Sequence, residues 1–357
     1  MEQFNSANAC LSWLQYLYQQ CGGAALLGND QLNKEHVRDM AAIYDIAPVR
    51  LRYFAEIPLI GQPGIDLSVE YPLILFRDGN PLHHPAVNQW GEFFYKLESR
   101  LQQLNPARAD DLVAYLEADT SRDGSGKSAA FVNLSGRLAE ILLPELLEWQ
   151  GMTERLTGIL KIIDKVDGFL VPWHFGFMRS RKELPFRLTL HRYNNDSNLL
   201  LNLFQSALKL ELFRFIDTAS EKISDLDSLG LTEYMLDIDI MPDGSIGDTI
   251  GIELHPFTAI LPGQQRTLVR QDQFRKLTDL LKKWGIADDR LDILPDCLWS
   301  MDAPDNTQAP YNMISYLSHM KLKWQKDRFC LAKVYLQLIT SEKQWSINET
   351  IPGRTVR

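Results

Sequence analysis

The chain has 357 residues, in which 37 Lys and Arg stand against 46 Asp and Glu, giving a formal net charge of −9. This acidic balance argues against a nucleic-acid-binding protein, which normally has a basic surface, and 45% hydrophobic with 23% charged residues exclude wholesale disorder. Because no apolar run approaches the ~18 residues of a membrane span and the N-terminus lacks a signal-peptide pattern, we expect a cytoplasmic globular protein.

Along the chain, pairs of predicted strands alternate with helical segments. In each pair, two runs with a two-residue hydrophobic alternation flank a polar turn, such as Gly-Gln-Pro-Gly at 61–64. The predicted strands are, in chain order, 49–59 and 65–75, 112–119 and 128–134, 173–178 and 186–192, 234–241 and 246–255, and 318–324 and 331–339.

The segments between these pairs have a helical periodicity. Helices are predicted at 6–20, 33–44, 87–104, 134–149, 153–166, 197–216 and 266–284, with a further helix ending before Gly230. The pattern indicates five successive ααββ units in which the order of elements repeats but the residues do not. No linker or low-complexity tract divides the chain, so we expect a single domain over residues 1–357.

Ten strands are more than an open twisted sheet carries comfortably, which favours closure. Each strand has one apolar and one polar face. If the helices cover the apolar faces, the strands form a closed ten-stranded antiparallel β-barrel of the α+β class with a polar interior. The alternative is a half-covered sheet whose polar face lies in solvent.

The polar strand faces carry a mixed set of ionisable side chains. In the last pair, Lys321 and Lys323 share one strand face with His319, and Lys333 shares a face of the next strand with Tyr335. The histidines at 191, 255 and 319 are too scattered for a metal site, and we interpret them as structural. The remaining charged residues of these faces are Arg52, Asp66, Glu70, Arg187, Asp237, Asp239 and Glu253.

This order of elements resembles the ABBA-type, or PT-barrel, aromatic prenyltransferases over nearly the whole chain. Ala332-Lys333-Val334-Tyr335 fits the Lys-x-Tyr form that recurs on strands of the family, although this sequence has only one clear copy. Arg187 in Phe-Arg-Leu-Thr and Lys321 in Met-Lys-Leu-Lys occupy comparable strand positions. Asp66 in Gly-Ile-Asp-Leu-Ser-Val is placed like the acidic residue with which indole-modifying members accept the aromatic N–H.

The resemblance implies transfer of an isoprenyl group from its diphosphate to an aromatic or other nucleophilic acceptor in natural-product biosynthesis. It implies no tightly bound cofactor. The carboxylates expected to act as general bases are Asp66, Glu70 and Glu253. The expected diphosphate-binding residues are Arg52, Arg187, Lys321, Lys323, Lys333 and Tyr335. If the reaction depends on Mg²⁺, Asp237 and Asp239 are the expected ligands.

Two other functions fit the same sequence. The barrel could perform another tailoring step of ribosomal-peptide biosynthesis, with its carboxylates and histidines serving acid–base chemistry. The chain could also be a non-catalytic module that binds a peptide, in which case the Arg and Lys faces would turn to solvent.

Overall fold

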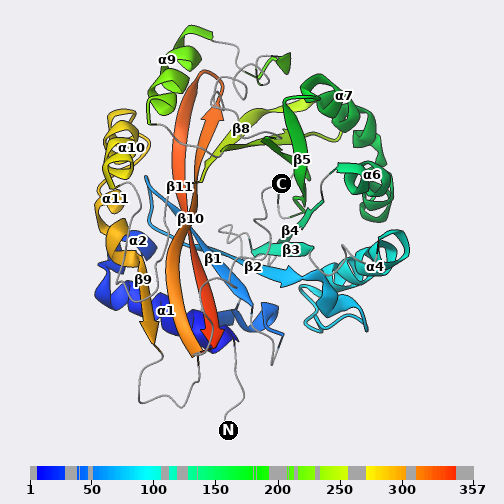
Figure 1. Ribbon diagram of the computed structural model, residues 1–357, viewed down its shortest axis with the longest axis horizontal. Helices are drawn as coiled ribbons and strands as arrows, with labels where there is room; N and C mark the ends of the chain where they lie inside the picture. Colours follow the sequence, from blue (N-terminus) through cyan, green and yellow to red (C-terminus); the bar gives the residue numbers. More distant parts are fainter. Residues whose placement is uncertain are drawn as a thin grey trace.

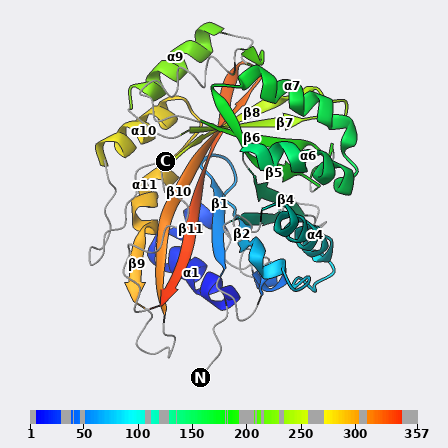
Figure 2. The same ribbon diagram turned by 45° about the vertical axis from the view of Figure 1, so that its right-hand side comes forward.

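Ten strands of the chain close into an antiparallel β-barrel in the computed structural model (Figures 1 and 2). The strand order is β1-β2-β3-β4-β5-β6-β7-β8-β10-β11, and pairing of β11 with β1 completes the ring. The structure describes residues 6–28, 38–39, 41–46, 51–105, 112–118, 128–134, 136–179, 181, 183–192, 207, 209–212, 216–229, 234–255, 271–302 and 311–342.

The barrel strands correspond to the ten predicted from the sequence. Their bounds are β1 Arg52–Pro58, β2 Asp66–Pro72, β3 Val113–Ala118, β4 Ser128–Asn133, β5 Leu170–Phe177, β6 Phe186–Arg192, β7 Tyr234–Ile240, β8 Ile246–Leu254, β10 Tyr311–Gln325 and β11 Arg328–Glu342. The closed barrel is therefore confirmed, and the half-covered open sheet is wrong.

The last hairpin differs from its prediction. β10 and β11 extend well beyond 318–324 and 331–339, and a short strand that was not predicted, β9 (Trp299–Asp302), pairs with the beginning of β10. Figure 2 shows β10 and β11 running most of the length of the molecule. A register shift between Leu317 and His319 interrupts the two-residue alternation of β10, so the sequence pattern marks only the part that follows it.

The helices lie around the outside of the barrel (Figure 1). Their bounds are α1 Ser6–Gln20, α2 Gly23–Leu27, α4 Asn88–Leu104, α6 Gly136–Gln150, α7 Leu156–Val166, α9 Ile216–Asp227, α10 Gln271–Lys283 and α11 Arg290–Ile293, with 3₁₀ turns η1 Leu73–Phe76, η2 Thr153–Arg155 and η3 Leu294–Cys297. Within the described part of the chain, no helix combines the length and apolarity needed to cross a membrane.

The predicted ααββ repeat is not confirmed. Between β2 and β3, α4 is the one α-helix among the described residues, whereas α6 and α7 both precede β5. The helix predicted at 197–216 and the first part of the one at 33–44 lie largely outside the described residues.

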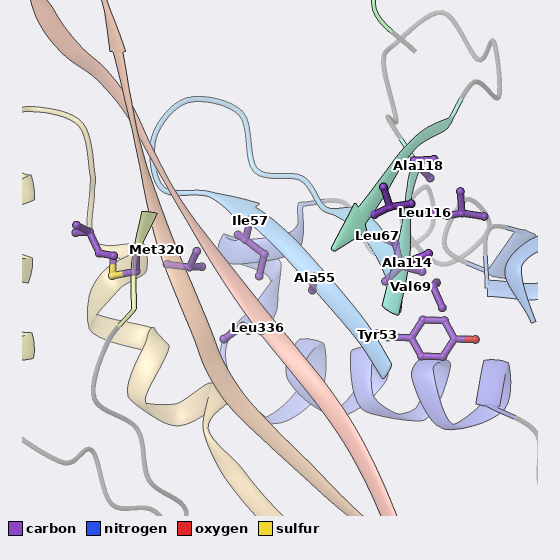
Figure 3. Packing of buried hydrophobic residues seen from close by; sticks show 14 of the residues in the cluster. Tyr53, Ala55, Ile57, Leu67, Val69, Ala114, Leu116, Ala118, Met320 and Leu336 are labelled. Carbon is purple, nitrogen blue, oxygen red and sulfur yellow. The ribbon is translucent and has the colours of Figure 1, made fainter. Parts of the chain in front are cut away.

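The main core lies between the helices and the outer faces of the strands. Alternate residues of β1, Tyr53, Ala55 and Ile57, are fully buried, and Figure 3 shows them beside the corresponding residues of β2 and β3. On the other side of the barrel, the rings of Phe93 on α4 and Phe177 on β5 meet edge to face at 5.2 Å. Because the outer faces are mainly apolar, most of the intervening polar side chains point inward.

Candidate active site inside the barrel

An aspartate with two arginine partners stands on the inner face of β7. Arg187 on β6 donates two hydrogen bonds to the Asp239 carboxylate, at 2.8 and 3.0 Å, and Arg181 donates a third at 2.9 Å. The register places Arg187 directly opposite Asp239. Burial raises the pKa of Asp239, but the two arginines outweigh it and hold the pKa below its ordinary value.

Lys321 on β10 connects two further carboxylates. Its ammonium group forms ion pairs with Asp237 on β7 and, at 3.2 Å, with Glu253 on β8. Gly251 on β8 lies between them, and a Cβ there would come within 2.8 Å of the Lys321 Cε. The glycine therefore leaves the space through which Lys321 reaches β7. The Thr189 hydroxyl donates to Asp237 at 2.6 Å.

Glu56 on β1 is the centre of a second group. The Lys333 ammonium and the Tyr335 hydroxyl, both on β11, donate to the two oxygens of its carboxylate. Burial raises the pKa of Glu56, but Lys333 and Tyr335 outweigh this effect and bring the pKa to about 2. We call Glu56, Glu117, Arg187, Asp237, Asp239, Lys321, Lys323 and Lys333 the ionic layer.

Rings line the inner face beside this layer. Tyr115 lies between Phe54, at 5.9 Å, and His174, at 5.6 Å, while His319 stacks on Tyr335 with ring centroids 4.0 Å apart. Burial lowers the pKa of His174 to about 4 and that of His319 to about 3, so both imidazoles are neutral at pH 7. We call Phe54, Tyr115, His174, His255, His319 and Tyr335 the aromatic–histidine belt.

The structure brings together most of the predicted diphosphate-binding residues. Lys321 lies opposite Lys333 in the β10–β11 register, Lys323 follows two residues later, and Arg187 connects to Lys321 through neighbouring Asp239 and Asp237. Arg52 does not join them. It stands at the other end of β1, about 20 Å along the strand from Pro58, which is the residue opposite Lys333.

The three predicted general bases lie apart from one another. Glu70 binds Arg52 at 2.9 Å, and Glu253 binds Lys321. Asp66, at the opposite end of β2 from Glu70, is half-buried beside Glu56 in the register. Burial raises the pKa of Glu70 despite Arg52, whereas Lys321 outweighs burial at Glu253 and lowers its pKa. Their roles stay a prediction.

Asp237 and Asp239, the ligands expected if the reaction depends on Mg²⁺, each have a cationic partner, and their role as metal ligands stays a prediction. Both carboxylates already bind cationic side chains, which Mg²⁺ would have to displace. Across the described ranges, no group of three His, Cys, Asp or Glu side chains is placed to hold a metal ion.

Two carboxylates of the ionic layer, Glu56 and Glu117, were not among the site residues predicted from the sequence. Glu56 lies in a strand whose inward face also carries Arg52 and Phe54, and Glu117 alternates with Tyr115 on β3. The signal was the same two-residue alternation that identified the other inward residues. Neither position has a distinctive local motif, so the alternation alone could not separate them from solvent-exposed acids.

No protein-family model matches the sequence, and no curated protein matches it. Among solved structures, NotF in complex with brevianamide F and DMSPP aligns over 97% of each chain with a TM-score of 0.55 and 12% identity. AnaPT from Neosartorya fischeri aligns over 96% of this chain and 94% of its own, with a TM-score of 0.52 and 10% identity.

A third solved structure also has a similar fold. The 6-dimethylallyltryptophan synthase from Micromonospora olivasterospora, in complex with DMASPP and Trp, covers 93% of this chain and 97% of its own at a TM-score of 0.51 and 13% identity. Each of these three alignments covers more than nine-tenths of this chain. The chain therefore has the PT-barrel fold of the ABBA-type aromatic prenyltransferases.

Proposed function

We propose that the protein is a prenyltransferase that moves an isoprenyl group from an isoprenoid diphosphate to an electron-rich aromatic acceptor. The observation that carries the proposal is the division of the barrel interior into an ionic layer with three lysines and the adjoining aromatic–histidine belt. An isoprenoid diphosphate is divided in the same way, into a dianionic or trianionic head and an apolar chain.

The lysines of the ionic layer suit the leaving group. When the C–O bond of the donor ionises, negative charge develops on the departing diphosphate, and fixed cations stabilise that charge. Among the described residues, Lys323 has no ion pair, and the side chain of Lys333 is 30% exposed. These two ammonium groups can therefore reach a bound anion with the least disturbance of existing pairs.

The aromatic–histidine belt suits the carbocation and its chain. Aromatic faces attract a cation through their quadrupole, and the neutral imidazoles of His174 and His319 add no repulsion. Tyr335 stands at the boundary, because its hydroxyl binds Glu56 while its ring stacks on His319. Enclosure by the barrel would also keep water from the cation.

The acceptor that we propose carries an indole. Two of the solved structures of similar fold contain Trp or brevianamide F, which supports an indole-bearing acceptor. A peptide acceptor is the alternative, and intact-mass measurement separates isoprenyl addition from another tailoring step. The peptide-binding module predicted Arg and Lys faces in solvent, whereas Arg187 and its partner Asp239 are both 9% exposed.

Thermal unfolding with added diphosphates tests the proposal. Dimethylallyl and geranyl diphosphate should raise the unfolding midpoint, because a ligand at 100 times its Kd stabilises the fold by about 2.7 kcal/mol. Geraniol and inorganic phosphate are the ligand controls. If no isoprenoid diphosphate raises the midpoint, the proposal is wrong.

Lys323→Ala sharpens the test. Removing this side chain leaves no described carboxylate unpaired, so the fold should persist while the diphosphate affinity falls by about tenfold or more. Lys161→Ala, an exposed lysine on α7, is the matched control and should bind as the wild type does. Equal affinities of the two variants would remove Lys323 from the site.

A further inference from the structure

We propose that Glu117 accepts the proton that the aromatic acceptor loses when the isoprenyl group is transferred. This inference rests on the proposed function and assigns a residue to its last step. Glu117 lies on the inner face of β3, between the outward-facing Leu116 and Ala118.

The geometry around Glu117 separates it from the other inward carboxylates. Glu56, Glu70, Asp237, Asp239 and Glu253 each bind a Lys or Arg side chain. Glu117 has no hydrogen bond or ion pair within the described part of the chain. Its neighbours in register are Ser68 on β2 and Ala129 on β4, whose short side chains leave its carboxylate without a cross-strand partner.

Charges from several elements surround this carboxylate. Glu56 on β1 repels it, while Arg187 on β6, Arg181 in the β5–β6 turn and Lys333 on β11 attract it. Asp66, the first residue of β2, lies two residues before Ser68 on the same strand face. Burial is the largest influence and, together with Glu56, raises the pKa of Glu117 to about 7 despite the three cations. A general base is most effective when its pKa lies near the working pH.

The step balances without a further reactant. The C1–O bond of the donor breaks, and its electron pair leaves with the diphosphate. A ring carbon or nitrogen of the acceptor bonds to C1, and the proton on that atom passes to the Glu117 carboxylate while its bonding electrons return to the ring. The products are the prenylated acceptor, diphosphate and the neutral Glu117 acid, which then releases the proton to water.

Three variants test the role on the acceptor that the wild type prenylates. Glu117→Gln should lower kcat by about 100-fold or more while dimethylallyl diphosphate binds at least as tightly as before. Glu117→Asp should recover part of the loss. Asp66→Asn changes one of the bases expected from the sequence and should retain more than half of the wild-type kcat. Glu140→Gln, on the exposed face of α6, should leave kcat unchanged.

The pH dependence gives a second readout. The acidic limb of the wild-type kcat profile should fall below a pH of about 7, where Glu117 becomes protonated, and Glu117→Gln should lack that limb. A Glu117→Gln enzyme with wild-type kcat and an unchanged acidic limb overturns the inference and leaves prenyl transfer standing. A wild type that binds no diphosphate and prenylates no acceptor overturns both proposals.

Stability supplies a measurement that needs no acceptor. The folded pKa of Glu117, about 7, lies above its ordinary 4.5, so the folded state binds the extra proton between these values and the wild type loses stability as the pH rises through this window. Glu117→Gln should therefore gain in unfolding midpoint over the wild type between pH 5 and pH 8. A difference that is constant with pH contradicts the raised pKa on which the assignment depends.

Discussion

The outward and inward faces of the same strands are stabilised by different interactions. On β7 the outward Leu236, Ile238 and Ile240 are completely buried among other apolar side chains, whereas the inward Asp237 and Asp239 each have specific cationic partners. An outward aliphatic residue needs only the right volume, and many neighbours can supply it. An inward carboxylate needs one particular side chain from another strand, so its stability depends on the closed barrel.

The largest expected effect is the loss of one partner from a buried ion pair. Asp239→Ala should lower the free energy of unfolding by about 3–5 kcal/mol, because it leaves the buried Arg187 guanidinium without a carboxylate. Arg181 is 37% exposed on its side chain and can turn to water. Chemical unfolding at pH 7 measures the loss, and the Asp239→Ala/Arg187→Met double variant should recover most of it. A loss below about 1 kcal/mol would mean that the inner face tolerates substitution as readily as a surface does.

A somewhat smaller effect is expected on the outer face. Leu116 is completely buried on β3 (Figure 3), and Leu116→Ala should cost about 2–5 kcal/mol through lost burial and the cavity that remains. Leu116→Met keeps the volume and should cost less than about 1.5 kcal/mol. The same unfolding experiment compares the two variants, and equal losses would show that the outer face also requires a specific side chain.

The smallest effect is expected where charges meet outside the barrel. Arg100 on α4 forms a bidentate ion pair with Glu145 on α6, with N···O distances of 2.8–3.1 Å, and both side chains are about one-third exposed. Water and salt screen such a pair, so Arg100→Ala should leave the unfolding midpoint nearly unchanged. If this variant loses as much stability as Asp239→Ala, the contrast between interior and exterior ion pairs is wrong.

The contrast between the two strand faces also explains which features of the fold could be predicted from the sequence. The alternation of Leu236, Ile238 and Ile240 with Asp237 and Asp239 is local, and it was sufficient to predict the strands, their polar inward faces and closure of the barrel. Helix periodicity likewise predicted α1 at residues 6–20, the bounds that it has. These features depend on neighbours in the chain, which a single sequence contains.

Partners across the barrel could not be predicted in the same way. Lys321, Lys333 and Arg187 all carry the expected charge, but their pairing with Asp237, Glu56 and Asp239 depends on strand register and on Gly251. The register shift after Leu317 also displaces the alternation that a sequence pattern assumes. For the same reason Glu117 was indistinguishable from other acids until its short-chained neighbours were placed beside it.

Closure of the barrel also sets the order in which the ionic layer can be completed during synthesis. Glu56 lies on the first strand, and its partners Lys333 and Tyr335 follow 277 and 279 residues later on the last. Until β11 emerges, β1 remains an unpaired edge with a carboxylate that has no counterion, and such edges favour association with other chains. Contacts this distant in sequence also slow folding. The growing chain is therefore most vulnerable to aggregation just before β11, in the last hairpin, pairs with β1, in the first hairpin.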